Sequence, residues 1–216
     1  VPMKLKIILL SIFTSLHSCY GKQAENNYEK ENLIKYLNYK RAYFASGCFW
    51  CVEAIYESVQ GVKEVYSGYC GGTTSNPTYS SIGTGRTGHA ESVEVIYDPS
   101  IVTYETLVDV FFGSHDPTTM NRQGPDMGSQ YRSIAFYIDD REKEIIKNKI
   151  QMLEKTDVFN NPIITEVKKF KKFYYAEEYH QDYEKLNPNN PYVRSVSIPR
   201  LNKFKTKFPE ILKSNH

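Results

Sequence analysis

The chain has 216 residues, which is enough for one domain with its own apolar core and for tails beside it. Its formal net charge is only +2 at pH 7, so the total charge excludes a strongly basic nucleic-acid binder. Lysines cluster at 167–173 and 200–208, where we interpret them as solvated surface. The 18 tyrosines and 11 phenylalanines suit either an aromatic pocket or a tyrosine-rich core.

The first 19 residues are typical of a targeting segment. Lys4 and Lys6 precede the apolar run IILLSIFTSL, which is too short for a permanent membrane span. The four residues LHSC at 16–19 resemble the box at which bacterial lipoproteins are cleaved and lipidated. We therefore predict a lipoprotein signal over 1–19, a lipid at Cys19 and a location outside the cytoplasm, in the bacterial cell envelope. A cleaved signal without a lipid, giving a periplasmic or secreted protein, is the alternative.

The rest of the chain divides into a polar linker at 20–40, a folded domain at 41–192 and a basic tail at 193–216, which we expect to be irregular because prolines interrupt it. Hydrophobic periodicity and turn residues predict the elements of the domain. In chain order these are a strand at 41–46, a helix at 48–58, a strand at 62–69, a loop at 70–89, a strand at 91–99, a helix from the N-cap Thr103 to 112, a loop at 114–132, a strand at 133–139, a helix at 140–155, a strand at 163–170 and a helix at 174–186.

Strands and helices alternate irregularly along the domain. This order predicts an α/β (α+β) fold, a two-layer sandwich with a mixed, mainly antiparallel sheet. The strand at 91–99 alternates in polarity, with Val93, Val95 and Tyr97 on one side, and is expected to be half-buried. The two long loops are rich in polar residues, and loops of this length in a compact domain are usually functional or disordered.

Two cysteines open the first predicted helix directly after Gly47. Cys48 lies at the helix N-terminus, where orphan N–H groups and the helix dipole favour a thiolate. Cys51 follows one turn later and can form a disulfide with an oxidised Cys48, because residues i and i+3 share a face. If Cys19 carries a lipid, three thiols remain, and an odd number argues against a fully paired framework.

Six short stretches of the sequence form a set of motifs: GCFWCVE (47–53), GYCGG (68–72), PTY (77–79), TGHAESVEVIYDP (87–99), HDPTTMNRQGPDMGSQYRS (115–133) and AEEYHQDY (176–183). In this order they resemble the peptide methionine sulfoxide reductase A (MsrA) family, over the whole predicted domain. The resemblance implies a ferredoxin-like α-β plait of the MsrA type. It also implies the activity of a peptide-methionine (S)-S-oxide reductase, an enzyme that repairs oxidised proteins or reduces free methionine sulfoxide.

The resemblance assigns roles to particular residues. Cys48 corresponds to the family nucleophile, which attacks the sulfur of the S sulfoxide. Glu91 corresponds to the acid that protonates the sulfoxide oxygen, and an apolar environment would keep its carboxyl neutral. The alternative for Glu91 is a solvent-facing residue at a strand edge.

The resemblance also implies a substrate pocket. Phe49 and Trp50 correspond to the pocket for the methionine methyl group, although Phe49 also suits the core. Tyr79 and Tyr131 correspond to tyrosines that hydrogen-bond the sulfoxide oxygen. Asp126 corresponds to an acidic residue on the substrate side, with a turn former beside Gly128 as the alternative.

The implied cycle leaves a sulfenic acid on Cys48, which Cys51 resolves as a disulfide, and a thioredoxin-type dithiol then reduces it. Many family members carry the resolving cysteine near the C-terminus, but no cysteine follows Cys70 here. Cys70 is expected to be a small buried side chain rather than a second relay thiol. We expect a monomer with no metal or other cofactor.

Two other functions compete with this interpretation. A thioredoxin-like oxidoreductase would explain the cysteine pair but not Glu91 or the loop at 114–132. A metal-binding lipoprotein could use Cys48, Cys51, Cys70 and His89 as four ligands, although their spacing is irregular.

Inhibition of lipoprotein signal peptidase in a bacterial host tests the predicted lipid at Cys19. We expect the unprocessed precursor to accumulate and to migrate more slowly on a gel, because cleavage before Cys19 is blocked. A soluble mature form of unchanged mobility would contradict the prediction.

Overall fold

The computed structural model describes residues 34–156 and 158–214. The chain forms two compact units, Val1–Tyr39 and Lys40–His216. In the first unit the described residues 34–39 hold a helical turn, in which the Tyr39 amide donates to the Tyr36 carbonyl at 3.1 Å. The predicted signal at 1–19 lies outside the described residues. Across the described ranges, no helix combines the length and the apolar character that a membrane crossing requires.

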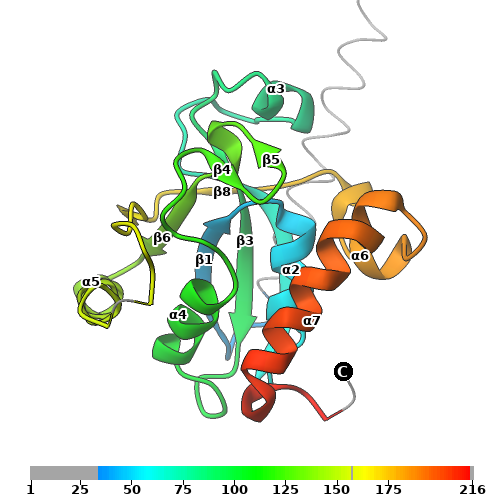
Figure 1. Cartoon of the computed structure of the whole chain (residues 1–216). Coiled ribbons are helices and arrows are strands. Elements are labelled where there is room, and N and C mark those ends of the chain that lie inside the picture. The colour runs from blue at the N-terminus through cyan, green and yellow to red at the C-terminus, as the bar shows by residue number, and fades with distance from the viewer. Residues whose placement is uncertain (1–33, 157, 215–216) are drawn as a thin grey trace, which may run out of the picture. The chain divides into compact units, whose positions relative to one another are not determined.

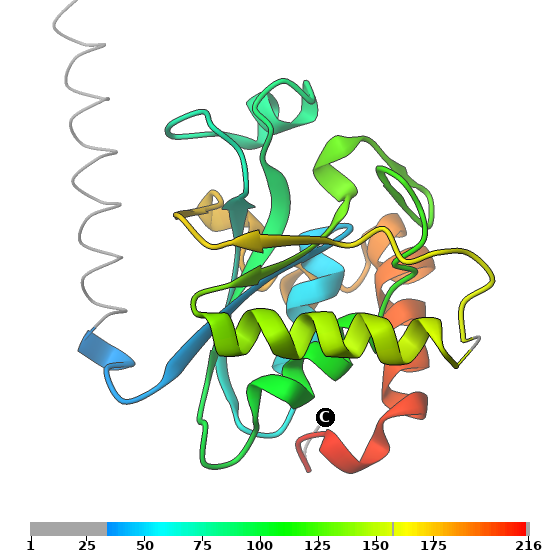
Figure 2. The same ribbon diagram turned by 90° about the vertical axis from the view of Figure 1, so that its left-hand side faces the viewer.

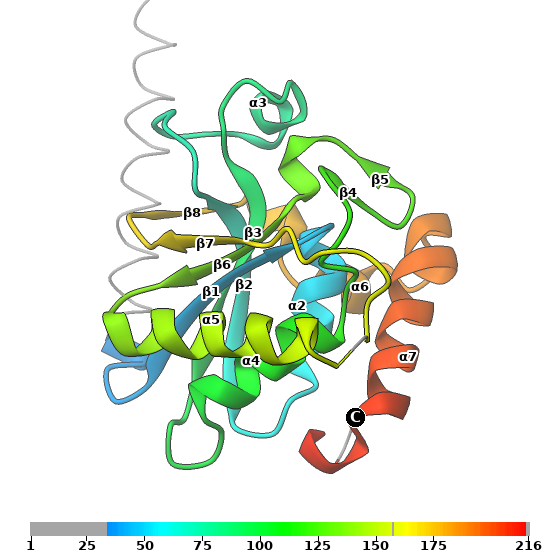
Figure 3. The same ribbon diagram turned by 60° about the vertical axis from the view of Figure 1, so that its left-hand side comes forward.

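The larger unit is built on a six-stranded sheet in the order β7-β6-β1-β3-β2-β8 (Figure 3). All neighbouring strands are antiparallel except β6 and β7. The predicted mixed, mainly antiparallel sheet of an α/β fold is therefore confirmed. The strands are β1 (Lys40–Ser46), β2 (Val62–Cys70), β3 (Ala90–Tyr97), β6 (Ser133–Tyr137), β7 (Glu166–Lys169) and β8 (Phe173–Tyr175), and a separate hairpin holds β4 (Arg122–Gln123) and β5 (Asp126–Met127).

The helices pack against this sheet and against one another. Helix α2 packs on β1, β2 and β3, α4 packs on β1, and α5 lies beside α4 and against β6 and β7 (Figure 2). Helix α7 runs along α2 (Figure 1). The helices are α2 (Phe49–Glu57), α3 (Tyr79–Gly83), α4 (Tyr104–Gly113), α5 (Asp140–Glu154), α6 (Tyr183–Leu186) and α7 (Ile198–Lys207), with 3-10 turns at Ser129–Tyr131, Glu178–His180 and Pro209–Ile211 and a π-helix at Val193–Ser197.

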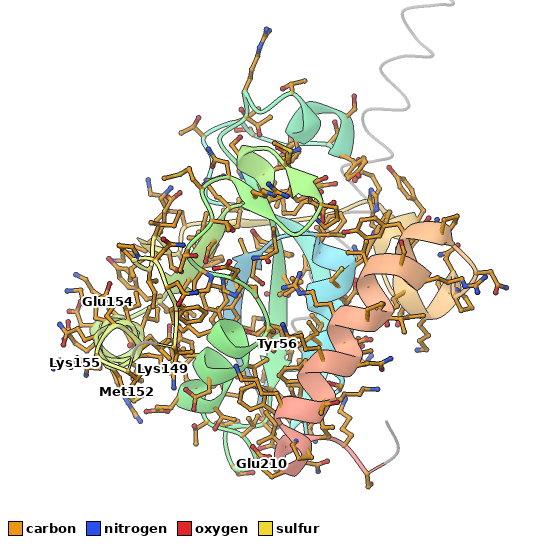
Figure 4. The ribbon with its side chains drawn as sticks, viewed as in Figure 1. Tyr56, Lys149, Met152, Glu154, Lys155 and Glu210 are labelled. Atoms are coloured by element: carbon orange, nitrogen blue, oxygen red, sulfur yellow. The ribbon has the colours of Figure 1, made fainter. Side chains whose placement is uncertain are left out.

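Aromatic rings join the helices to the sheet. The ring of Phe44 on β1 stacks on Tyr56 of α2 and on Phe111 of α4, with centroids 5.2 and 5.3 Å apart. The Tyr56 hydroxyl donates to the Leu107 carbonyl at 3.0 Å, which ties α2 to α4 (Figure 4). Thr103 caps α4 as predicted, because its side chain accepts from the Thr106 amide. These contacts hold the C-terminal end of α2 against the sheet and α4.

Two predictions about strands and helices are wrong. All eight residues of β3 are buried, where a half-buried strand was expected, because β3 is central in the sheet and is flanked by β1 and β2. The helix predicted at 174–186 is replaced by β8, a 3-10 turn and α6. The first residues of the predicted helix instead form β8, which pairs with the edge of β2. Asp182, in the left-handed conformation (φ 52°), interrupts the remaining residues.

The prediction that residues 193–216 form an irregular tail is also wrong. Residues 198–207 form α7, and Phe204 of that helix is buried in the main core. Pro199 is the second residue of α7 and directly follows the π-helix Val193–Ser197. The amide that proline lacks therefore falls where one type of helix gives way to the other, and the helical run continues through it.

Replacement of Phe204 by alanine tests whether α7 is part of the core. We expect Phe204→Ala to lower the free energy of unfolding by about 3–5 kcal/mol, because a buried aromatic ring is lost and leaves a cavity. Urea unfolding measures the change, with the exposed Asn202→Ala in the same helix as control. Equal stability of the two variants would show that α7 is only loosely attached.

Candidate active site

Cys48 lies at the junction of β1 and α2. It is the N-cap residue of α2, and the Val52 amide donates the first helical bond to its carbonyl at 3.3 Å. Gly47 before it has φ +93°, and a Cβ there would lie 2.6 Å from the Cβ of Gln123. A glycine is therefore required both by the turn and by the loop that packs over it. The thiol is 6% exposed.

The Glu91 carboxyl lies beside this cysteine. Glu91 projects from the buried strand β3 and is 2% exposed, and the Phe49 amide donates to its Oε2 at 3.1 Å. Because Phe49 directly follows Cys48, this bond places the carboxyl next to the thiol. Burial raises the pKa of Glu91 to about 8, so that the group is mostly neutral at neutral pH. The alternative of a solvent-facing glutamate is excluded.

The two thiols at the helix start differ in their protonation. Burial raises the pKa of Cys48 well above its usual value, and the adjacent Cys51 thiol adds to the rise. A hydrogen bond from Cys48 lowers the pKa of Cys51 to about 6, and the Arg200 guanidinium contributes. Burial therefore opposes the effect of the helix start at Cys48, whereas the hydrogen bond and the Arg200 guanidinium favour ionisation of Cys51.

Aromatic rings pack around the residues between the two cysteines. The Phe49 ring lies 6.2 Å from Tyr79 and 5.0 Å from His180, measured between centroids, and is buried. Trp50 stacks on Tyr183 at 3.7 Å, and its Nε1 donates to Nδ1 of His180 at 3.1 Å. Both predicted pocket residues therefore belong to one aromatic cluster, and Phe49 is also part of the core.

The remaining predicted residues come from the two long loops. The pKa values of Tyr79 and Tyr131 are both raised, first by burial and then by the Glu91 carboxyl, and Cys48 adds to both shifts. Both rings therefore approach the same pair of groups. Asp126 accepts from the Tyr192 hydroxyl at 2.6 Å. The structure thus brings the eight predicted site residues into one region around the start of α2.

Cys70 lies apart from this pair, at the end of β2. Its thiol donates to the Lys172 carbonyl at 3.2 Å, and burial raises its pKa to about 12. These features favour a packing role over a relay role. No group of three or more His, Cys, Asp or Glu side chains within 34–156 and 158–214 is placed to hold a metal ion.

Three residues at this site were missed by the sequence reasoning. His180 lies within the quoted motif AEEYHQDY, so the motif itself was a signal for it. Tyr192 contacts Cys51, with its hydroxyl 3.9 Å from Sγ, and Arg200 lies on α7. No local pattern marks either of these two residues, and only the docking of the C-terminal segment brings them to the cysteines.

The buried Glu91 carboxyl predicts a pH dependence of stability. Its pKa is raised from roughly 4.3 in an unfolded chain to about 8 in the folded protein. Its contribution to stability is therefore fully present below the unfolded pKa and is lost as the pH rises through about 8. We expect Glu91→Gln to flatten the fall in the free energy of unfolding across this window. Urea unfolding at several pH values measures it, with the exposed Glu210→Gln as control. Parallel curves for wild type and Glu91→Gln would contradict the assignment.

Comparisons with known proteins agree with this geometry. A family model described as peptide methionine sulfoxide reductase matches residues 40–212. The peptide methionine sulfoxide reductase MsrA of Pasteurella multocida is 47% identical over 174 residues, which cover 81% of this chain and 99% of that protein. The MsrA of Trichodesmium erythraeum is 49% identical over 164 residues, which cover 76% of this chain and 93% of that protein.

Solved structures lead to the same family. Methionine sulfoxide reductase A of Corynebacterium diphtheriae superposes with a TM-score of 0.63 at 36% identity and covers 70% of this chain and 76% of its own. The reduced form of Mxr1 from Saccharomyces cerevisiae gives a TM-score of 0.65 at 37% identity, over 71% of this chain and 88% of its own. The chain therefore belongs to the peptide methionine sulfoxide reductase family, and its activity is that of the A type, the reduction of the S epimer of methionine sulfoxide to methionine.

Proposed function

We propose that Cys48 is the nucleophile of this reductase, Glu91 its proton donor and Cys51 its resolving thiol. One observation carries the proposal: the Glu91 carboxyl, buried and held by the Phe49 amide, adjoins the cysteine pair at the start of α2. A buried neutral acid beside a nucleophilic sulfur is what reduction of a sulfoxide requires, because the sulfoxide oxygen leaves only when it is protonated.

In the first step, the proton of the cysteine pair passes to Cys51, which leaves the thiolate on Cys48. The Cys48 sulfur attacks the sulfoxide sulfur, and Glu91 donates its proton to the oxygen as that oxygen transfers to Cys48. Methionine leaves, Cys48 becomes a sulfenic acid, and Glu91 becomes a carboxylate. Two electrons pass from the cysteine sulfur to the substrate.

In the second step, Cys51 closes a disulfide with Cys48. Glu91 takes the proton from the Cys51 thiol, and the Cys51 sulfur attacks the sulfenic sulfur. The hydroxyl group leaves as water after Glu91 returns its proton, so that Glu91 ends the step as a carboxylate and takes up a proton from solvent before the next turnover. Cys48 is the N-cap of α2 and Cys51 lies in its first turn, so that the two thiols are within reach of each other.

We propose that the aromatic cluster holds the substrate methyl group. Phe49 and Trp50 supply flat apolar surfaces, and the stacking of Trp50 on Tyr183 fixes the indole ring. Tyr79 and Tyr131 approach Glu91, where their hydroxyls can bind the sulfoxide oxygen. The Tyr192 hydroxyl fixes Asp126 beside this region.

Recycling and location complete the proposal. A thioredoxin-type dithiol would reduce the disulfide by thiol exchange, and the chain needs no metal for this chemistry. Residues 1–19 support a location outside the cytoplasm, in the cell envelope, with a lipid on Cys19 as the membrane anchor. Oxidised methionine in envelope proteins is then the expected substrate.

Turnover of separated R and S sulfoxides by four forms of the enzyme tests these roles. We expect the wild type to consume only the S epimer and Cys48→Ser and Glu91→Gln to lose at least ~100-fold in rate, because the nucleophile or the proton is lost. Cys51→Ser should release one equivalent of methionine and then stop. Robust turnover by Cys48→Ser would disprove the mechanism. The control is Cys70→Ser, which should retain turnover.

A further inference from the structure

A groove of about 590 Å³ opens beside the resolving cysteine. Its walls come from the loop between α4 and β5, from Tyr192 and from α7, and Cys51 is part of its lining while Cys48 is not. The two sulfurs of the pair therefore have different surroundings. Cys48 adjoins Glu91 on the sheet side, and Cys51 adjoins the groove and the C-terminal helix.

Arg200 of α7 lines this groove and is fixed by two backbone carbonyls. Its Nε donates to the Ser114 carbonyl and its Nη2 to the Ser46 carbonyl, both at 2.9 Å. Its Nη1 would lie 3.4 Å from a Cβ built on Gly47, so that the guanidinium covers the turn that leads into Cys48. Two of its nitrogens thus anchor the group, and the third faces the helix start.

Among residues 34–156 and 158–214, no carboxylate lies within salt-bridge distance of the Arg200 guanidinium. The neighbouring His115 does not add to it, because burial, followed by Arg200 itself, lowers the pKa of that imidazole to about 3. A partly buried cation of this kind needs an anion nearby. The acidic side chains in the lining of the groove are Asp116 and Asp126, and Cys51 is the thiol there.

We propose that Arg200 is a positioning residue for the resolving step: its anchored guanidinium compensates the negative charge on the Cys51 sulfur and thereby speeds closure of the Cys48–Cys51 disulfide. The inference rests on the proposed roles of these two cysteines. It assigns to the C-terminal helix a part in catalysis that the sequence reasoning did not give it.

The other groups that face Cys51 do not replace this cation. The Tyr192 hydroxyl lies 3.9 Å from the Cys51 sulfur, and Cys48 and Ser197 lower the pKa of this thiol as uncharged neighbours. These are neutral groups. Glu91 and Asp126 are carboxyls, and a negative charge on either would disfavour a thiolate. Among these neighbours of Cys51, Arg200 alone is a cation, and it lowers the pKa of the Cys51 thiol.

A single-turnover experiment on the full chain separates Arg200 from the chemistry at Cys48. Reduced enzyme is mixed with one equivalent of S sulfoxide, and methionine release and disulfide formation are followed separately by quenching with acid and alkylation. We expect Arg200→Gln to release methionine at close to the wild-type rate but to close the disulfide at least ~3-fold more slowly at pH 7, because less Cys51 is a thiolate. The deficit should disappear near pH 9.

Two further variants sharpen this comparison. Arg200→Lys keeps the charge but loses the paired anchor, and should close the disulfide at an intermediate rate. Lys203→Gln removes a cation from the same groove and helix without a contact to Cys51, and should match the wild type. Closure by Arg200→Gln with the wild-type pH profile would overturn the role of Arg200. Absence of methionine release from the wild type would instead refute the proposed function.

A direct titration keeps the inference testable if Arg200→Gln does not fold. In a full chain with serine at positions 19, 48 and 70, Cys51 is the remaining thiol, and its rate of alkylation by iodoacetamide reports its ionisation against pH. With Arg200 present we expect a midpoint well below the ~8.5 of an ordinary thiol. It should rise by about one unit in Arg200→Gln and stay unchanged in Lys203→Gln. A midpoint at the ordinary value with Arg200 in place would overturn the proposal.

Discussion

The hydrogen bond from the Phe49 amide to the Glu91 carboxyl is the contact on which the rest of the site depends. It joins the first turn of α2 to the centre of the sheet, and so it couples the position of the nucleophile to that of the acid. The carboxyl can accept this bond while still carrying a proton on its other oxygen. One contact therefore holds the acid in place and leaves its proton available.

Buried carboxyls recur around this centre. Glu53 on α2 accepts from the Ser67 hydroxyl at 2.6 Å and from the Asp182 amide at 2.8 Å, which ties the segment that carries His180 to the helix. Glu94 on β3 accepts from the hydroxyls of Tyr43 and Tyr175, both at 2.8 Å. In each case hydrogen bonds offset the loss of water that burial imposes on the group. The domain thus uses acidic side chains of α2 and β3 as connections between elements, and Glu91 differs from the other two by lying beside a thiol.

Much of the fold and of the site could be predicted from the sequence. The pattern around Cys48, Glu91 and the two long loops was informative because each motif is local, and the structure brings those motifs together. The charge on the cysteine pair could not be predicted, since it depends on how deeply Cys48 is buried. Arg200 escaped notice for a related reason. It is separated from Cys51 by most of the domain, and a proline in its helix looked like an interruption until the structure placed it in the first turn.

The position of α7 has a consequence for synthesis of the protein. The cysteine pair belongs to the second element of the domain, whereas Tyr192 and Arg200 belong to its last stretch. The ribosome therefore synthesises both cysteines early, whereas it adds Tyr192 and Arg200, which surround the resolving sulfur, only near the end of translation. Until α7 docks, a nascent chain that met an oxidant would form its sulfenic acid without the arginine beside the thiol that must remove it. The order of elements along the chain thus makes the proposed assistance by Arg200 a property of the fully folded domain.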